Sequence, residues 1–344
     1  MSWRLDGEID VEVVTLNQPQ RTIAGPAAFA GIGLHSGCEG IFTAEPAAPG
    51  YGIRFGTGPS AATAPPTAFA YSQDHTTSVL LPGIQLRCVE HFMSALHGLG
   101  ITNLYVRCHA GDEFPILDGS ARGIASALRA AEIVEQEAAA QAVRINAPFA
   151  LADASTGRSI TCAPGAGLSV MAEIDFPLPI GRQSRLFVST PQAYESQLAS
   201  ARTFLKDPVD ASSLAELRGG RLKGLAEPCP VIFYNREKFL CPLRFEDEPV
   251  RHKITDFLGD IYTIGMTIEG AFHLVRPGHE LTRRFVELLE AALERRGVDR
   301  GPTPQRIPAP VRQKAAASAG QSTMAMPTVA AIQASERSTG TPSA

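Results

Sequence analysis

Two distant segments of this chain carry side chains that could together bind a metal ion and move protons. The first segment contains an adjacent glutamate and histidine, and the second contains one histidine and two aspartates at intervals of four residues. A further histidine follows nearer the C-terminus. These residues are Glu90, His91, His252, Asp256, Asp260 and His279. Two histidines and one aspartate can hold a zinc ion with one coordination position open, and a carboxylate base and a histidine acid beside it would suit hydrolysis of an amide or an ester.

The second segment has the spacing of an amphipathic helix over about 250–264. Its apolar stripe consists of Ile254, Phe257, Leu258 and Ile261. The histidine and the two aspartates stack on another face, because positions four apart lie one above another. His252 and Asp256 could therefore chelate one ion, whereas Asp260 is better placed to accept a hydrogen bond from a catalytic histidine. The competing interpretation is a solvated polar face, since His-x-x-x-Asp is a weak pattern.

The two common zinc-peptidase patterns are absent. The sequence contains no His-Glu-x-x-His, and Arg87 stands where His-x-x-Glu-His would need a histidine before Glu90. A metallopeptidase of either kind is therefore not expected.

Length and composition indicate an ordinary globular protein with two domains. The chain has 344 residues, of which 44% are hydrophobic and 19% are charged. The net charge of −4 does not favour a nucleic-acid-binding protein. The N-terminus lacks a secretory signal pattern, and no apolar run reaches about 18 residues, so we expect a cytoplasmic protein with no membrane span and at most peripheral membrane contact. The cysteines form no Cys-x-x-Cys pair, which favours reduced thiols.

The expected elements occur in the same order in two halves of the chain. In the first half they are a hairpin over 40–44 and 51–55, a helix over 89–97, a strand over 103–108 and a helix over 120–133. In the second half they are a hairpin over 158–162 and 168–174, a helix over 249–265, a strand over 271–275 and a helix over 279–296. The repeat predicts an α+β fold of two similar tandem domains, each a β-sheet layer packed on helices, with the active site in the cleft between them.

The composition also predicts where these domains begin and end. We expect an N-terminal extension at 1–17, a first domain at 18–138, a second domain at 143–298 and a Pro/Ala/Ser-rich tail at 301–344. The tail is expected to be disordered, because it cannot bury enough apolar surface to offset the entropy of ordering it.

Six short sequence motifs are distributed over nearly the whole of the expected fold. They are Gly31–Gly37 (GIGLHSG), Val89–Leu96 (VEHFMSAL), Phe114–Ala121 (FPILDGSA), Ala201–Phe204 (ARTF), Arg244–Lys253 (RFEDEPVRHK) and the pair Gly278 and His279. In this order they resemble the UDP-3-O-acyl-N-acetylglucosamine deacetylase family, the zinc hydrolases of lipid A biosynthesis known as LpxC. The family fold, two similar α+β domains, agrees with the repeat of elements. The resemblance implies hydrolysis of the N-acetyl group of UDP-3-O-acyl-N-acetylglucosamine, with release of acetate and UDP-3-O-acyl-glucosamine.

The resemblance also implies roles for the metal-binding and proton-transfer residues. The zinc ligands that it implies are His91, His252 and Asp256. Glu90 matches the family's general base, and His279 matches the acid that pairs with an aspartate at the place of Asp260. One catalytic Zn²⁺ is expected, although Fe²⁺ suits two histidines and a carboxylate as well.

The same resemblance assigns three further residues to the substrate, and the sequence offers a fourth candidate. Thr203 matches a hydroxyl near the developing oxyanion, and Lys253 matches a cationic partner in the family's site. Phe204 matches an aromatic residue that lines the sugar site. His35, in the glycine-rich turn, is a candidate for substrate binding, with a structural role in the turn as the alternative.

One segment differs from the family pattern and keeps other functions open. Family members carry a Gly-Gly-Ser segment before the strand that leads to the His252 helix, whereas 224–230 contains Pro228 and Pro230. Prolines stiffen the chain and remove amide donors at a border of the family's acyl passage. The alternatives are a catalytically weakened homologue that binds a nucleotide-sugar or a lipid, and a protein-binding scaffold whose histidines are ordinary surface residues. We expect a monomer in each case.

Overall fold

The computed structural model of the protein describes residues 3–58, 68–71, 76–206, 219, 222–224 and 230–298. The predicted tail at 301–344 and residues 225–229 of the segment that differs from the family lie outside the described residues. The strands are β1 (Trp3–Asp6), β2 (Val11–Ile23), β3 (Ala27–Ile32), β4 (Glu39–Pro46), β5 (Ile53–Gly56), β6 (Ala68–Tyr71), β7 (Thr77–Leu81), β8 (Ile84–Leu86), β9 (Leu104–Ala110), β10 (Ile133–Ile145), β11 (Phe149–Asp153), β12 (Arg158–Ala163), β13 (Leu168–Asp175), β14 (Arg182–Val188), β15 (Phe204–Lys206), β16 (Ile232–Tyr234) and β17 (Thr267–Val275). The helices are α1 (Glu90–Leu99), α2 (Arg122–Ala130), α3 (Pro191–Gln197), α5 (Glu248–Tyr262) and α6 (His279–Arg295).

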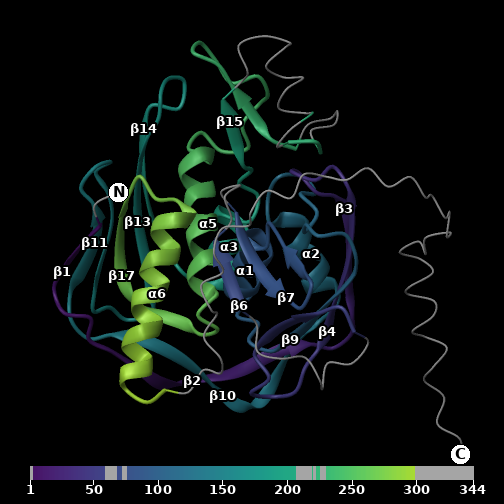
Figure 1. The fold of residues 1–344 in the computed structure, drawn as a ribbon, viewed down its shortest axis with the longest axis vertical. Coiled ribbons are helices and arrows are strands. Elements are labelled where there is room, and N and C mark those ends of the chain that lie inside the picture. Colours follow the sequence, from purple (N-terminus) through teal and green to yellow (C-terminus); the bar gives the residue numbers. More distant parts are fainter. Residues whose placement is uncertain are drawn as a thin grey trace, which may run out of the picture. The chain divides into compact units, whose positions relative to one another are not determined.

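Sheets and helices are mixed along the chain, which confirms the predicted α+β class. One sheet has the order β3-β4-β9-β5. A larger sheet has the order β1-β11-β12-β17-β10-β2, and β13 and β14 extend it from β17. Figure 1 shows α1 and α5 in the middle of the fold, with α6 next to α5. Within the described ranges, no helix combines the length and the apolar character that a membrane crossing requires.

Both predicted hairpins were wrong in their pairing, although their strands exist. In the first half, β9 lies between β4 and β5, antiparallel to β4 and parallel to β5. In the second half, β17 lies between β12 and β13, antiparallel to β12 and parallel to β13. The turn residues predicted a reversal of the chain correctly but not the later strand that enters between the two strands. A parallel pair cannot be joined by a tight turn, so each half needs a long crossover connection. The first crossover contains α1, and the second contains α3 and α5.

The repeat of element order is therefore also a repeat of strand pairing. The series β3-β4-β9-β5 corresponds to β11-β12-β17-β13 in order and in every strand direction. The predicted domain boundaries stay predictions. Residues 1–17 supply β1, which pairs with β11, and the start of β2, which pairs with β10. We refer below to residues 18–138 as the first half and to residues 143–298 as the second half.

The helix α5 has the apolar stripe that its sequence predicted. All four residues of the stripe are at most 1% exposed. The face with His252, Asp256 and Asp260 is also buried, at 2%, 4% and 3% exposure, so the alternative of a solvated polar face is wrong. Gly259 allows α5 to approach α1 closely, because a Cβ atom there would lie 2.0 Å from the main-chain oxygen of Glu90. The two helices thus meet where their functional residues lie.

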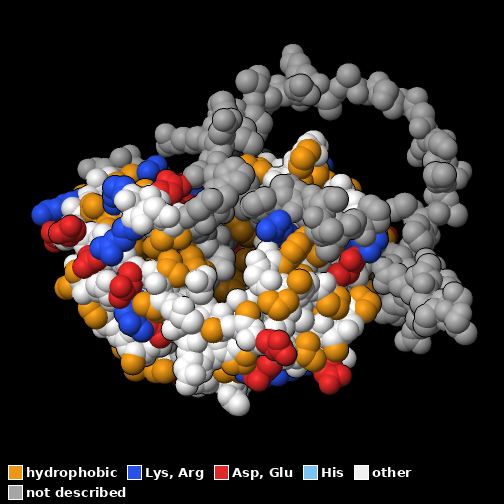
Figure 2. Space-filling model, turned by 90° about the horizontal axis from the view of Figure 1, so that it is seen from below, with side chains coloured by type: hydrophobic (Ala, Val, Ile, Leu, Met, Phe, Trp, Pro, Cys, Tyr) orange, Lys and Arg blue, Asp and Glu red, His pale blue; other side chains and the backbone are white. Residues whose placement is uncertain are grey.

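One face of the molecule shows how charge is distributed at the surface. In Figure 2, Lys/Arg and Asp/Glu side chains are interspersed, and hydrophobic side chains line a hollow in this face. No field of a single sign dominates the view, as expected for a net charge of −4.

Candidate active site

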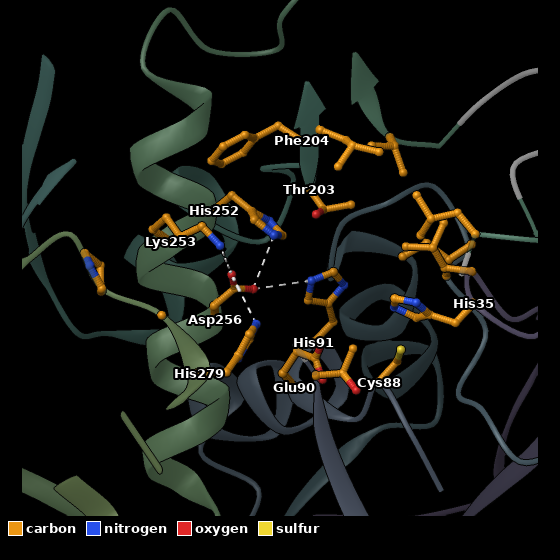
Figure 3. Close-up of a pocket in the computed structure, with 18 of the residues that line it drawn as sticks. His35, Cys88, Glu90, His91, Thr203, Phe204, His252, Lys253, Asp256 and His279 are labelled. Carbon is orange, nitrogen blue, oxygen red and sulfur yellow. Dashed lines mark hydrogen bonds and ion pairs between the residues drawn. The ribbon is translucent and has the colours of Figure 1, made fainter. Parts of the chain in front are cut away.

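A cavity of about 520 Å³ is lined by residues from both halves of the chain. The lining includes the sequence-predicted residues Glu90, His91, Thr203, Phe204, His252, Lys253, Asp256, His279 and His35. Asp260 contacts one of these lining residues, His279, from outside the lining. Figure 3 shows the lining residues. Residues that are far apart in sequence therefore meet at one site.

The cluster His91, His252 and Asp256 could hold a metal ion, since one ligand atom from each lies within 4.8 Å of the others. The Asp256 Oδ1 atom is 3.2 Å from His252 Nε2 and 3.6 Å from His91 Nε2. His252 Nδ1 lies 3.2 Å from the main-chain oxygen of Ala201, which leaves Nε2 facing the cluster. In Figure 3 the two imidazoles point toward the Asp256 carboxylate from α1 and α5.

The protonation states of this cluster also fit a cation. Burial lowers the pKa of His252 to about 3, so its imidazole is neutral at pH 7. Burial opposes the charge on Asp256, but the Lys253 ammonium and a hydrogen bond from His91 help to hold the pKa of Asp256 well below its ordinary value. A neutral imidazole and a carboxylate are the forms in which these side chains bind metal.

Glu90 opens α1 and is almost fully buried. Its Oε2 atom accepts a hydrogen bond of 3.1 Å from the main-chain N–H of Thr77. Burial raises the pKa of Glu90, partly offset by the nearby His279 and His91. A carboxylate with a raised pKa is a stronger base than an exposed glutamate.

His279 opens α6 and contacts an aspartate directly. Its Nδ1 atom is 2.8 Å from Asp260 Oδ2, and its Nε2 atom is 3.8 Å from Asp256 Oδ2. Burial would lower the pKa of His279, but the Asp260 carboxylate outweighs burial and raises the pKa to about 9. The imidazole is therefore protonated at pH 7 and can donate a proton.

Three cavity residues that belong to the second half lie beside the metal cluster. Lys253 Nζ is 2.8 Å from Asp256 Oδ2 and 5.4 Å from the centroid of the Phe204 ring. The Phe204 and His252 rings are 6.2 Å apart. Thr203 is fixed by its main chain, which donates a hydrogen bond of 2.8 Å to the oxygen of Gly119. An ammonium, a hydroxyl and an aromatic ring thus face one space.

His35 lies on the opposite side of the cavity from Lys253 (Figure 3). Its turn is held by Glu113, a residue that the sequence analysis did not identify. The Glu113 carboxylate accepts main-chain hydrogen bonds from His35 at 2.7 Å and Ser36 at 2.6 Å, and a thiol hydrogen bond from Cys88 at 3.3 Å. His35, Cys88 and Glu113 also group ligand-type atoms within 4.8 Å, but both oxygens of Glu113 already accept hydrogen bonds, so the first cluster fits a cation better.

Cys88 is a hydrogen-bond donor rather than a nucleophile. Burial raises the pKa of its thiol well above the ordinary value, and the carboxylates of Glu90 and Glu113 raise it further. The thiol is therefore protonated at neutral pH.

Thr77 is the second residue that the sequence analysis missed. It contacts both Glu90 and Asp260. Threonine is common in strands, and no spacing rule links Thr77 to the two helices.

Comparison with known proteins connects this geometry to one family. Residues 20–291 match the family model described as UDP-3-O-acyl N-acetylglycosamine deacetylase, LpxC. A UDP-3-O-acyl-N-acetylglucosamine deacetylase of Myxococcus xanthus is 34% identical over 273 residues, which cover 78% of this chain and 85% of that protein. The Aquifex aeolicus protein of the same name is 33% identical over 272 residues, which cover 78% of this chain and 92% of that protein. A third protein of that name, from Saccharophagus degradans, is 33% identical over 285 residues, which cover 79% of this chain and 90% of its own length.

Proposed function

Because this chain belongs to the UDP-3-O-acyl-N-acetylglucosamine deacetylase family, we propose that the cavity formed by α1, α5 and α6 is its active site. The chain hydrolyses the N-acetyl group of UDP-3-O-acyl-N-acetylglucosamine, a step of lipid A biosynthesis, and releases acetate and UDP-3-O-acyl-glucosamine. The assignment of single residues to this reaction rests on the geometry of the cavity.

The metal of this site is proposed to be Zn²⁺, held by His91, His252 and Asp256. Two imidazoles and one carboxylate form a donor set that zinc accepts and that leaves a coordination position open. Fe²⁺ accepts the same donors, so the donor set does not decide between the two metals. A zinc ion bound there would supply Lewis-acid activation of water and of the acetyl carbonyl.

Glu90 is proposed as the general base. It would accept a proton from the water molecule as the water oxygen forms its bond to the acetyl carbon. Its buried position and raised pKa support this role, because a carboxylate that is poorly solvated gains more from taking up a proton.

His279 is proposed as the general acid, with Asp260 as its partner. When the bond between the acetyl carbon and the sugar nitrogen breaks, that nitrogen needs a proton to leave as an amine. His279 is protonated at pH 7, and its Nδ1 atom contacts Asp260. Its Nε2 atom lies 3.8 Å from Oδ2 of Asp256. The reaction needs a carboxylate base and a protonated acid at one pH, and the contact with Asp260 keeps His279 in the acid form.

The remaining cavity residues are proposed to bind the substrate. Thr203 and Lys253 can donate hydrogen bonds to the oxygen that becomes negative as water adds. The Phe204 ring can pack against the apolar face of the sugar, and His35 can contact the substrate from the other side. We also propose that the protein acts in the cytoplasm, because its substrate is a charged nucleotide sugar, and that it is a monomer.

The observation that carries this assignment is the convergence of Glu90, the metal cluster and His279 on one cavity. The test is acetate release from UDP-3-O-acyl-N-acetylglucosamine by the metal-loaded wild type and by Glu90→Gln, with metal content measured in both. We expect turnover by the wild type and a loss of about 10²- to 10⁴-fold in kcat for the variant, with the metal retained. Substrate binding without acetate release by the wild type would favour the catalytically weakened homologue instead.

A further inference from the structure

Thr77 makes hydrogen bonds to both residues that are proposed to handle protons. Its main-chain N–H donates to Glu90 Oε2 at 3.1 Å. Its hydroxyl donates to Asp260 Oδ1 at 2.6 Å. The other oxygen of Asp260, Oδ2, is 2.8 Å from His279 Nδ1. A single residue thus contacts the base directly and the acid through its aspartate.

The contact with Asp260 determines how that carboxylate is oriented. One carboxylate oxygen accepts from Thr77 and the other from His279, so rotation of the group would break at least one hydrogen bond. Asp260 is 3% exposed and Thr77 is 5% exposed, so water cannot readily replace the threonine hydroxyl. Hydrogen bonds to buried charged groups are stronger than those between neutral groups. Because the Asp260 carboxylate is held in one orientation, its hydrogen bond also holds the imidazole of His279 in one orientation.

Thr77 is itself held firmly against α1. Its main-chain oxygen accepts a hydrogen bond of 3.1 Å from the N–H of Val89, the residue before Glu90. Thr77 belongs to β7 in the first half, whereas Asp260 and His279 belong to α5 and α6 in the second half. Thr77 therefore contacts α1, which carries the base, through its main chain, and α5, which carries Asp260, through its hydroxyl.

Thr77 does not line the cavity, although its neighbour Thr76 does. It is therefore not placed to touch the substrate. From these contacts we infer that Thr77 is a positioning residue, whose hydroxyl orients Asp260 and, through it, His279 relative to Glu90. This inference rests on the proposed deacetylase function.

The substitution Thr77→Val isolates the hydroxyl, because valine has nearly the same shape and keeps the main-chain contact with Glu90. We expect kcat for acetate release to fall about 10- to 100-fold, since a hydrogen bond to a buried charged group is lost. KM and metal content should stay near their wild-type values, because Thr77 contacts neither the cavity nor a metal ligand in the described contacts. Thr77→Ser, which keeps the hydroxyl, should stay within about threefold of wild-type kcat.

Ser78 provides a matched control on the same strand. Its side chain is 0% exposed, and its hydroxyl has no hydrogen-bond partner among the residues that the structure describes. Ser78→Ala therefore removes a buried β7 hydroxyl without touching the proton-transfer residues, and kcat should not change.

A double-mutant cycle separates positioning from a general effect on the fold. If Thr77 acts through Asp260, then Thr77→Val should change kcat by less than about twofold when Asp260 is already alanine. An equal loss in both backgrounds, an equal loss in Ser78→Ala, or an unchanged kcat in Thr77→Val alone would overturn the inference. Should Thr77→Val fail to fold, Thr77→Ala takes its place with the same expectations. Absence of acetate release from the wild type would instead overturn the proposed function, and this inference with it.

Discussion

The two halves of the molecule have the same strand order and directions, yet they contribute different chemistry. In the first half, the proposed base and the metal ligand are adjacent in the first turn of α1, as Glu90 and His91. The second half uses successive turns of α5 and the first residue of α6. The helix α2, which follows β9 as α6 follows β17, contributes no residue to the cavity lining among the described residues. The repeated topology brings two crossover helices together, and the residues on their contact faces then decide what each half does.

This division places the proton acceptor and the proton donor in different surroundings. Glu90 in the first half has a pKa raised by burial, whereas His279 in the second half has a pKa raised to about 9 against burial by Asp260. An imidazole without such a partner has an ordinary pKa of about 6.5 and would be mostly neutral at pH 7. The Asp260 contact in the second half therefore keeps the proposed acid protonated at neutral pH.

The largest expected effect tests this asymmetry at the proton-transfer residues. His279→Gln should lower kcat by about 10²- to 10⁴-fold, because glutamine can accept and donate hydrogen bonds but cannot release a proton to the leaving amine. Steady-state acetate release and metal content are the measurements, with Glu90→Gln as the corresponding variant of the other half. A kcat within about threefold of wild type for His279→Gln would contradict the role of His279 as the general acid.

The next effect concerns the place where the halves touch. Gly259→Ala should destabilise the protein by about 3 kcal/mol, since the new Cβ atom would lie 2.0 Å from the Glu90 main-chain oxygen and α5 would have to move away from α1. Urea unfolding measures the loss. Gly123→Ala in α2 is the control, because its Cβ would meet only a flexible leucine side chain at 3.3 Å and should change stability by less than about 1 kcal/mol. Equal effects of the two substitutions would contradict the close helix contact.

A smaller effect should appear as a pH dependence of stability. His97 lies in the last turn of α1 and packs against Tyr262 of α5 with ring centroids 5.3 Å apart. Burial lowers the pKa of His97 to about 4, below its ordinary value of 6.5. Between these pH values the unfolded chain binds the proton and the folded chain does not, so stability is lost as pH falls from 6.5 toward 4.

His97→Gln should remove this part of the pH dependence. The unfolding free energy of the wild type should fall by about 2 kcal/mol more than that of the variant when pH drops from about 7 to 5. Urea unfolding of both proteins at the two pH values checks it. Parallel pH curves would show that His97 does not titrate as its burial implies.

The smallest expected effect concerns the stability that two ion pairs between the halves contribute. Asp118 accepts from Arg244 at 3.0 Å and from its neighbour Ser120, whereas Arg129 and Glu195 pair at 2.9 Å with more exposed side chains. Asp118→Asn should cost about 1 kcal/mol of unfolding free energy. Glu195→Gln should cost less than about 0.5 kcal/mol, because solvent screens an exposed pair. A larger loss for Glu195→Gln would reverse this ranking.

The sequence predicted the helices well and the strand pairing badly, for one physical reason. Helix positions follow from local spacing, as the buried stripe of α5 shows. Strand partners depend on distant segments, and nothing between 40 and 55 indicates that β9 would separate β4 from β5. The metal cluster and Glu90 could be predicted because they belong to six motifs that occur in the order typical of one family. Thr77 and Glu113 could not, because their importance comes from contacts across the fold rather than from any pattern around them.

The central claim is that both halves hold one metal ion together. The most direct test is the number of zinc ions per chain after metal loading and removal of excess, in the wild type and in the variants His91→Ala and Glu90→Gln. We predict one ion in the wild type, one in Glu90→Gln and none in His91→Ala, since His91 belongs to the cluster that could bind the ion and Glu90 does not. One tightly bound ion in His91→Ala would show that the second half holds the metal alone, and would contradict the account of a shared site.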